Sequence, residues 1–132
     1  MSEHSFEVRV YYEDTDFSGN VYHAAYLKFL ERGRTEWLRQ MGIRHSALAQ
    51  TGIAFAVRSM EIQFDAAAHI DDLLSVKTRV FGVSAARLTL TQTILRDTLV
   101  LTRAQVLVVA IKTSGGPARL PAEIRAQLAG LA

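Results

Sequence analysis

The sequence contains no cysteine. This absence excludes disulfide bonds, thiolate nucleophiles and cysteine-based zinc sites, although it does not by itself fix the cellular compartment. No apolar run reaches the ~18 residues that a membrane-spanning helix needs, and the most apolar stretch, residues 104–111, is too short. The N-terminal residues lack the basic and apolar regions of a signal peptide. We therefore expect a cytoplasmic protein without a membrane span.

Several other classes of protein are disfavoured. The net charge is only +2, and the basic residues are scattered without interleaved aromatic residues, so we expect no nucleic-acid partner. No Walker loop, dinucleotide fingerprint or nucleophile elbow is present. The four histidines lack the i, i+4 pairing of a zinc helix, so no metal is expected. Without a linker or repeat, residues 1–132 are predicted to form a single globular domain.

The first half of the chain changes its hydrophobic period once. Residues 6–12 alternate, which predicts a strand with Phe6, Val8, Val10 and Tyr12 on one face. From about residue 23 to residue 41 the period becomes 3.6, which predicts a long helix. Its apolar stripe contains Tyr26, Phe29, Leu30, Gly33, Trp37 and Met41. A glycine in that stripe indicates a close approach between helix and sheet, because glycine costs about 1 kcal/mol inside a helix.

The second half is rich in strands. Four runs are predicted as strands, at residues 54–66, 73–83, 86–96 and 99–112, and short helices are expected at 46–50 and 121–129. In the first run, one face should hold Ala54, Ala56, Met60, Ile62 and Phe64. This order predicts an α+β domain with one antiparallel sheet of about five strands and one principal helix. One helix covers only part of such a sheet, so we expect a homo-oligomer.

The junction between the first strand and the long helix has the densest chemistry. Asp14, Asp16, Gly19 and His23 lie within ten residues there. A carboxylate and the unpaired N–H groups of a helix start can meet at such a junction. Asp16 is the leading candidate for a general base or nucleophile, and the N–H groups would stabilise an oxyanion.

Structural explanations compete with this interpretation. Asp16 or Asn20 would serve equally well as a helix cap. Asp14 and Glu13 are alternative acids, and Asp14 fits a turn residue or a supporting acid. His23 would orient a water molecule or substrate, contribute only its backbone N–H, or simply pack at the helix start. From residue spacing alone, these alternatives stay open.

The residues of this junction also resemble a known family. The segments Val8–Asp16, Val21–Ala24, Tyr26–Arg32 and Arg34–Glu36, together with Gly19, are similar to the 4-hydroxybenzoyl-CoA thioesterase family, and most similar to its Tol–Pal-associated acyl-CoA thioesterase group. The resemblance extends to Ala54–Arg58, Asp71–Asp72 and Ala104–Val109, and so covers nearly the whole chain.

The resemblance implies a hotdog fold, in which the sheet wraps the long helix, and a dimer or dimer of dimers with active sites between subunits. It implies hydrolysis of an acyl-CoA thioester without metal or cofactor. By position, Asp16 is the catalytic carboxylate, and His23 supplies the helix-start N–H and an imidazole. Gly19 and Tyr22 belong to the substrate site. The group usually has small residues where this chain has Phe17 and Ser18, so Phe17 is predicted to line the acyl pocket.

Three further expectations accompany this assignment. Arg58 is the nominee for binding the coenzyme A phosphates. The carrier of the acyl group is coenzyme A or, as an alternative, acyl carrier protein. The competing functions on the same fold are a non-catalytic module that binds acyl-CoA or acyl carrier protein, and an enoyl-CoA hydratase that leaves the thioester intact.

Overall fold

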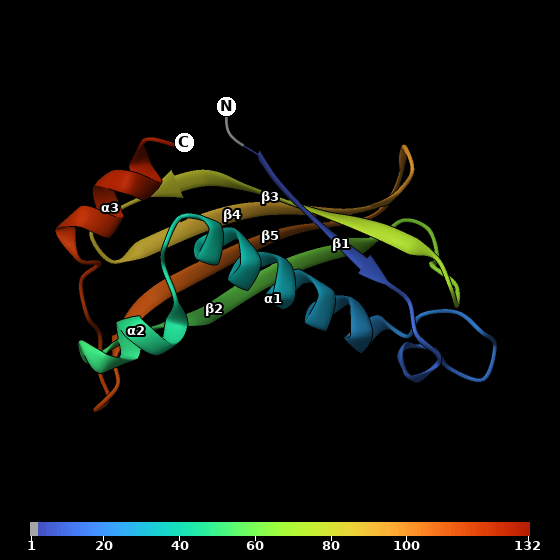
Figure 1. The fold of residues 1–132 in the computed structure, drawn as a ribbon, viewed down its shortest axis with the longest axis horizontal. Helices are drawn as coiled ribbons and strands as arrows, with labels where there is room; N and C mark the ends of the chain where they lie inside the picture. The colour runs from blue at the N-terminus through green and yellow to red at the C-terminus, as the bar shows by residue number, and fades with distance from the viewer. Residues whose placement is uncertain (1–2) are drawn as a thin grey trace.

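The computed structural model describes residues 3–132. Five strands form one antiparallel sheet in the order β1-β3-β4-β5-β2. The strands are β1 (Glu3–Arg9), β2 (Ile53–Phe64), β3 (Leu73–Val83), β4 (Arg87–Arg96) and β5 (Leu99–Lys112), and the helices are α1 (His23–Gln40), α2 (His45–Gln50) and α3 (Ala122–Ala129). Figure 1 shows the strands curving around α1, which lies along one face of the sheet. The predicted α+β architecture is confirmed.

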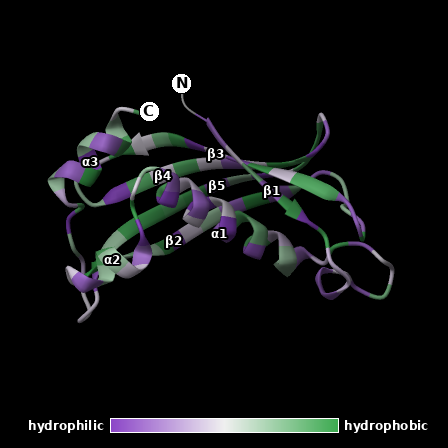
Figure 2. Ribbon diagram, viewed as in Figure 1, coloured by the Kyte–Doolittle hydropathy of each residue, from purple (hydrophilic) through white to green (hydrophobic). Residues whose placement is uncertain are grey.

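The core lies between α1 and the inner face of the sheet. Figure 2 shows apolar residues along the strands that curve around α1, and the buried side chains at every second position of β3 and β4 form the inner face. The predicted buried stripe of α1 is confirmed from Tyr26 to Trp37, whereas Met41 is only partly buried and lies just after the helix. Burial of these side chains stabilises the fold because it removes apolar surface from water.

Gly33 lies where α1 approaches the sheet most closely. A Cβ atom added there would lie 2.6 Å from Cγ1 of Val76 on β3. The predicted reason for a glycine in the helix interior is therefore confirmed: a side chain at this position would push α1 away from the sheet.

Two strand predictions were wrong. β1 ends at Arg9, and Tyr12 begins a 3-10 turn, η1 (Tyr12–Asp14), so its side chain is exposed rather than on the buried face. The face assigned to β2 was wrong in its first half, because the pairing with β5 shifts at Arg58. Phe55, not Ala54 or Ala56, shares the inner face with Met60 and Ile62. A β-bulge places one extra residue in a strand and so reverses its alternation.

Candidate active site

The turn before α1 is fixed mainly by backbone hydrogen bonds. The carboxylate of Asp14 accepts a hydrogen bond from the Tyr11 N–H at 2.8 Å, and its carbonyl accepts one from Tyr22 at 3.2 Å. Asp14 therefore closes η1 and is a turn residue, as one of its two predicted roles required. Gly19 has φ of +84°, a conformation that residues with a Cβ rarely adopt. These features fix where Asp16 is placed.

Asp16 is exposed and forms a local turn of its own. Its Oδ1 accepts hydrogen bonds from the N–H of Ser18 at 2.8 Å and from the Ser18 hydroxyl. Those bonds, from the hydroxyl first and the backbone second, hold the pKa of Asp16 below its ordinary value despite slight desolvation. No hydrogen bond to Oδ2 is found among residues 3–132, although the backbone N–H of Asn20 also helps to lower the pKa of Asp16. The carboxylate is thus ionised at neutral pH with one oxygen available to a ligand.

The start of α1 supplies unpaired donors close to this carboxylate. Tyr22 is the N-cap residue and makes no side-chain capping bond. Among the described residues, the N–H groups of His23 and Ala24 have no hydrogen-bond acceptor. Such groups carry the positive end of the helix dipole and favour a negatively charged oxygen. Neither predicted helix cap is present, because Asp16 bonds within its own turn instead.

Asp16, Tyr22 and His23 line one cavity of about 380 Å³. Its other wall follows the end of β2, with Tyr26 of α1 between the two, and consists of Phe64, Asp65, Ala66 and Ala67. The sequence did not single out Asp65, which forms an ion pair with Arg103 at 2.7 Å. Its position at the end of a predicted strand is the only feature that distinguishes Asp65 in the sequence.

Residues 68–72 follow the cavity wall at the end of β2 and connect it to the Asp16 turn through backbone hydrogen bonds. The N–H of Val21 bonds to Ala68 O at 2.9 Å, and the N–H of Ile70 bonds to Gly19 O at 3.3 Å. Asp72 supports this segment, since it accepts bonds from the His69 N–H at 2.9 Å and from Arg96 Nη1 at 2.7 Å. Partial burial opposes ionisation of Asp72, but these bonds outweigh it and lower its pKa.

The Asp72 network gives a testable prediction for this site. Asp72→Asn removes the charge-assisted bond to Arg96, which contributes about 1.5–3 kcal/mol. Loss of this bond should displace the Gly19 turn and lower activity about 10-fold. Because the pKa is depressed on folding, the stabilisation is present at neutral pH and is lost as pH falls below 4 toward the folded pKa. Acid unfolding of parent and variant should therefore converge at low pH, and an unchanged difference would contradict the assignment.

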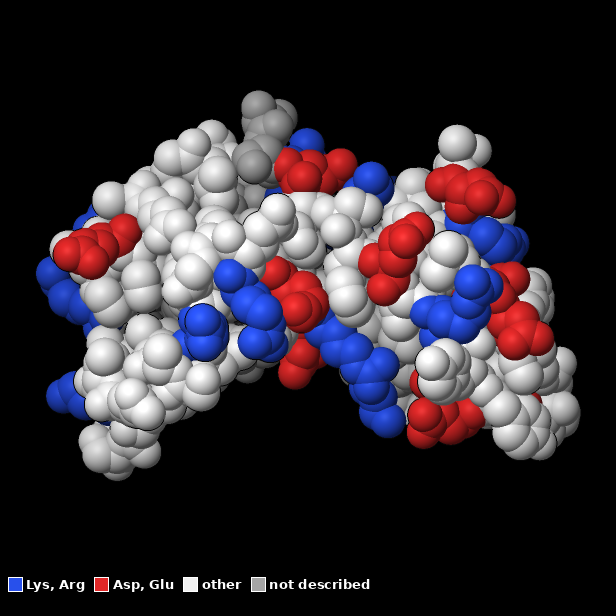
Figure 3. Space-filling model, viewed as in Figure 1, with Lys and Arg blue, Asp and Glu red and all other residues white. Residues whose placement is uncertain are grey.

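Three predicted substrate residues, Gly19, Phe17 and Arg58, do not line this cavity in a single chain. Phe17 is fully exposed at the tip of the turn. Arg58 is exposed at the bulge of β2 and does not line the Asp16 cavity. Figure 3 shows acidic and basic side chains interspersed over the face that carries α1. No group of three or more metal-ligand side chains, and no helix able to cross a membrane, occurs among residues 3–132.

Comparison with known proteins decides the family. The model of the thioesterase-like superfamily matches residues 10–128. The chain belongs to the thioesterase-like superfamily. It is 44% identical over 124 residues to the acyl-CoA thioesterase YbgC of Haemophilus influenzae, and this match covers 92% of the chain and 91% of that protein. The prediction of a thioester hydrolase is thereby confirmed.

Solved structures support the hotdog fold of this thioesterase. A probable thioesterase from Bartonella henselae is 46% identical, with a TM-score of 0.87, and the match covers 91% of this chain and all of that one. A mutant 4-hydroxybenzoyl CoA thioesterase complexed with 4-hydroxybenzoyl CoA has a TM-score of 0.88 at 17% identity, over 96% of this chain and 99% of the other. The second likeness concerns the fold alone, and the predicted hotdog fold is confirmed.

Proposed function

We propose that Asp16 and the uncapped start of α1 form the reaction centre of this acyl-CoA thioesterase. The observation that carries the proposal is their meeting in one cavity, where an ionised carboxylate lies beside N–H groups without acceptors. A thioester carbonyl bound with its oxygen toward the N–H groups of His23 and Ala24 would present its carbon to Asp16. The oxyanion formed on attack would be stabilised by preorganised donors, each typically worth a factor of 10²–10³ in rate.

Two routes follow for the attack. As a general base, Asp16 removes a proton from water, the hydroxide adds to the carbonyl carbon, and the C–S bond breaks to release the coenzyme A thiolate. As a nucleophile, Asp16 adds to the carbon itself, the C–S bond breaks to release the coenzyme A thiolate, and the resulting acyl anhydride is then hydrolysed by water. One turnover in ¹⁸O-labelled water tests for the anhydride. Label in the Asp16 carboxylate would demonstrate an anhydride that water opens at the Asp16 carbonyl, whereas attack of water on the thioester places the label in the product acid alone.

Release of thiol from acyl-CoA substrates tests the proposed activity. We expect hydrolysis without added metal or cofactor across a panel of aliphatic and aromatic acyl-CoA thioesters. A non-catalytic binding module would bind these compounds and release no thiol. A hydratase would consume enoyl-CoA and leave the thioester intact. Parallel assays with acyl carrier protein thioesters identify the carrier, and a loss of coenzyme A affinity in Arg58→Ala would support the phosphate contact predicted for that residue.

The acid limb of the pH profile follows from the bonds to Asp16. Because the Ser18 hydroxyl and N–H lower the pKa of Asp16, the carboxylate should stay ionised to a lower pH than an ordinary aspartate does. In Ser18→Ala this pKa should rise toward its ordinary value, since the hydroxyl bond is lost. The acid limb of kcat/KM should therefore move to higher pH in the variant. A limb unaffected by Ser18→Ala would argue against Asp16 as the titrating group.

The open edge of the sheet supports a site shared between two copies. β2 pairs with β5 on one side only. Val57 and Phe64 on its inner face keep 45% and 47% of their surface exposed. Phe64 lines the Asp16 cavity, whereas Val57 lines a second cavity near the other end of β2. Antiparallel pairing of two β2 strands about a two-fold axis would place the second cavity of one copy beside the Asp16 cavity of the other.

Introducing a charge at this edge tests the assembly. We expect the parent protein to be a dimer or a dimer of dimers by light scattering. Val57→Glu places a charge in the predicted interface and should yield monomers with at least 10-fold lower activity. Thr91→Glu, on the outer face of β4, is the matched control and should leave the dimer intact. A monomeric parent with full activity would contradict the shared site.

A further inference from the structure

Asn20 lines the Asp16 cavity, and its side chain has no hydrogen-bond partner in the described part of the chain. The residue is half-buried. It does not cap α1, because the N-cap residue is Tyr22. A partly buried amide costs free energy unless a water molecule or a ligand bonds to it. The partner of this amide must therefore come from the cavity.

A tight hairpin places this amide beside the Asp16 carboxylate. Thr15 and Val21 form an antiparallel bridge, and the Asp16 N–H bonds to Asn20 O at 2.9 Å. The Gly19 N–H bonds to Asp16 O at 3.1 Å, and the positive φ of Gly19 closes a three-residue loop. Asp16 and Asn20 are therefore the last pair of the hairpin. Residues that lie directly opposite in this way have Cβ atoms about 4.5–5.5 Å apart.

The side chains of Asp16 and Asn20 lie on the same side of the hairpin. Val21 is buried in the core, and successive side chains of an extended segment point to opposite faces. Asn20 therefore points away from the core, on the side where the exposed Asp16 lines the cavity. The amide and the carboxylate thus face one cavity from adjacent positions.

A water molecule between these two groups would have an acceptor for each of its protons. Oδ1 of Asp16 accepts two hydrogen bonds from Ser18, and no bond to Oδ2 is found among residues 3–132, so Oδ2 can accept one proton. The amide oxygen of Asn20 can accept the other. Two acceptors provide the two polar partners that a bound water needs. They also leave the lone pairs of the water directed toward a carbonyl carbon in the cavity.

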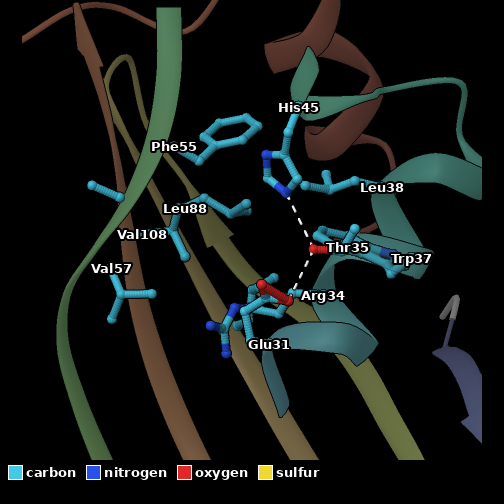
Figure 4. A pocket seen from close by; sticks show the side chains of 12 residues that line it. Glu31, Arg34, Thr35, Trp37, Leu38, His45, Phe55, Val57, Leu88 and Val108 are labelled. Atoms are coloured by element: carbon cyan, nitrogen blue, oxygen red, sulfur yellow. Dashed lines mark hydrogen bonds between the residues drawn. The ribbon is translucent and has the colours of Figure 1, made fainter. Parts of the chain in front are cut away.

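The second cavity does not compete strongly for the protons of this water. In a site shared between two copies, it would adjoin the Asp16 cavity of the other copy. The second cavity has a volume of about 260 Å³ and lies between the C-terminal half of α1 and the sheet (Figure 4). Its strand side is apolar and consists of Phe55, Val57, Leu88, Leu90 and Val108. These side chains offer no acceptor to a water molecule.

The polar groups on the α1 side of the second cavity are engaged with protein partners. The Thr35 hydroxyl donates to Glu31 at 3.2 Å and lies 3.3 Å from Nε2 of His45, as the dashed lines in Figure 4 show. Arg34 is a donor rather than an acceptor, and it bonds to Gln92 at 3.1 Å. The attacking water therefore depends mainly on the carboxylate and the amide of the hairpin.

We propose that the Asn20 amide oxygen is the second acceptor for the attacking water, so that Asn20 favours water over other nucleophiles. Asp16 removes one proton, Asn20 accepts a hydrogen bond from the other, and the hydroxide oxygen adds to the thioester carbon. The C–S bond then breaks, and the thiolate and the acid leave. The proton on Asp16 passes to the thiolate or to solvent. The proposal rests on the proposed function in its general-base form.

Competition between water and methanol tests this role. Methanol has one O–H proton, which Asp16 can accept, and its methyl group takes the place of the proton that bonds to Asn20. Methanolysis yields a methyl ester and coenzyme A, whereas hydrolysis yields the acid and coenzyme A. The ratio of ester to acid at one fixed methanol concentration measures the preference. We would use benzoyl-CoA and hexanoyl-CoA as substrates.

Asn20→Val removes the acceptor and keeps a side chain of similar size. Hydrolysis should slow about 10-fold and methanolysis by less than about twofold, so the ratio of ester to acid should rise at least about 5-fold. A purely structural role for Asn20 would slow both reactions equally. A rise of less than about threefold would overturn the proposal. Thr93→Val, on the outer face of β4, is the matched control and should keep the parental ratio.

Asn20→Asp is the conservative variant, because it keeps an acceptor oxygen at this position. It should keep the parental ratio of ester to acid when measured above the acid limb, where both carboxylates are ionised. The added charge should raise the pKa of the pair and move the acid limb of kcat/KM to higher pH. A ratio that rises in Asn20→Asp as it does in Asn20→Val would overturn the proposal.

If no methyl ester forms, kcat decides the question. Asn20→Val should then lose about 10-fold in kcat with KM within about twofold, and Asn20→Asp should recover most of this loss. Equal losses in both variants would overturn the proposal. If Asn20→Val does not fold, Asn20→Ala replaces it, since alanine also lacks an acceptor. Failure of the proposed function looks different: thiol release would be absent from the parent or unchanged in Asp16→Asn.

Discussion

Asp16→Asn should lower kcat for acyl-CoA hydrolysis by about 10²–10⁴-fold, because asparagine can neither accept the proton of a water molecule nor attack the carbonyl. The change preserves the shape of the side chain, and the amide oxygen can still accept the bonds from Ser18. KM and the melting temperature should therefore change little. Thiol release under steady-state conditions and thermal unfolding are the measurements.

Glu13→Gln is the matched control for that variant. Glu13 lies three residues earlier, is exposed, and takes part in no hydrogen bond or ion pair within the described chain. Glu13→Gln removes the same charge from this turn as Asp16→Asn does. Because only the bulk electrostatics change, kcat should stay within about twofold of the parent. Turnover of Asp16→Asn within tenfold of the parent would exclude Asp16 from the chemical step.

Gly33→Ala should destabilise the fold by about 1–3 kcal/mol, although alanine is the better helix former by about 1 kcal/mol. The reason is the 2.6 Å separation between the added Cβ and Cγ1 of Val76, which lies in the packed core and has little room to move. Denaturant unfolding measures the loss. A stabilised variant would show that α1 and the sheet can separate without cost.

A double-mutant cycle isolates the contact. Val76→Ala removes the clashing methyl group and alone should cost stability through the cavity that it leaves. The combined variant should be more stable than the sum of the two single changes predicts, by about 1 kcal/mol or more, because residues in contact do not act additively. Gly130→Ala, where the nearest atoms lie at 3.5 Å, is the control without a clash.

The elements were predictable wherever one residue pattern decided them. The 3.6 period of α1, the alternation of β3 and β4, and the role of Gly33 all followed from burial on one face. The predicted inner face of β2 was wrong because a bulge leaves no signal in the composition: Arg58 looks like any polar residue in an alternating strand. The predicted end of β1 was wrong because Tyr12 continues the apolar alternation in the sequence, although Asp14 closes a 3-10 turn there.

The candidate site, too, was predictable from the sequence only in part. Asp16, Gly19 and His23 are close in sequence, so their convergence at a helix start was predictable, although their catalytic roles remain predictions. Asp65 and the second cavity depend on contacts between residues far apart in the chain. Gln92 and Arg34, for example, are separated by 58 positions. His45 has no sequence signal beyond the lack of a zinc-helix partner, but it begins α2 and contacts Thr35 across the second cavity.

The extra residue in β2 also constrains how this strand can change its length. Removing Arg58 would restore simple alternation along the strand. Val57 and Met60 would then stand two positions apart, so Phe55 and Val57 would stay inward opposite Ala110 and Val108, and Met60 and Ile62 would keep their places. A single-codon deletion at this point would thus spare both ends of the protein's interior, because the codon lost is the one without a partner on β5.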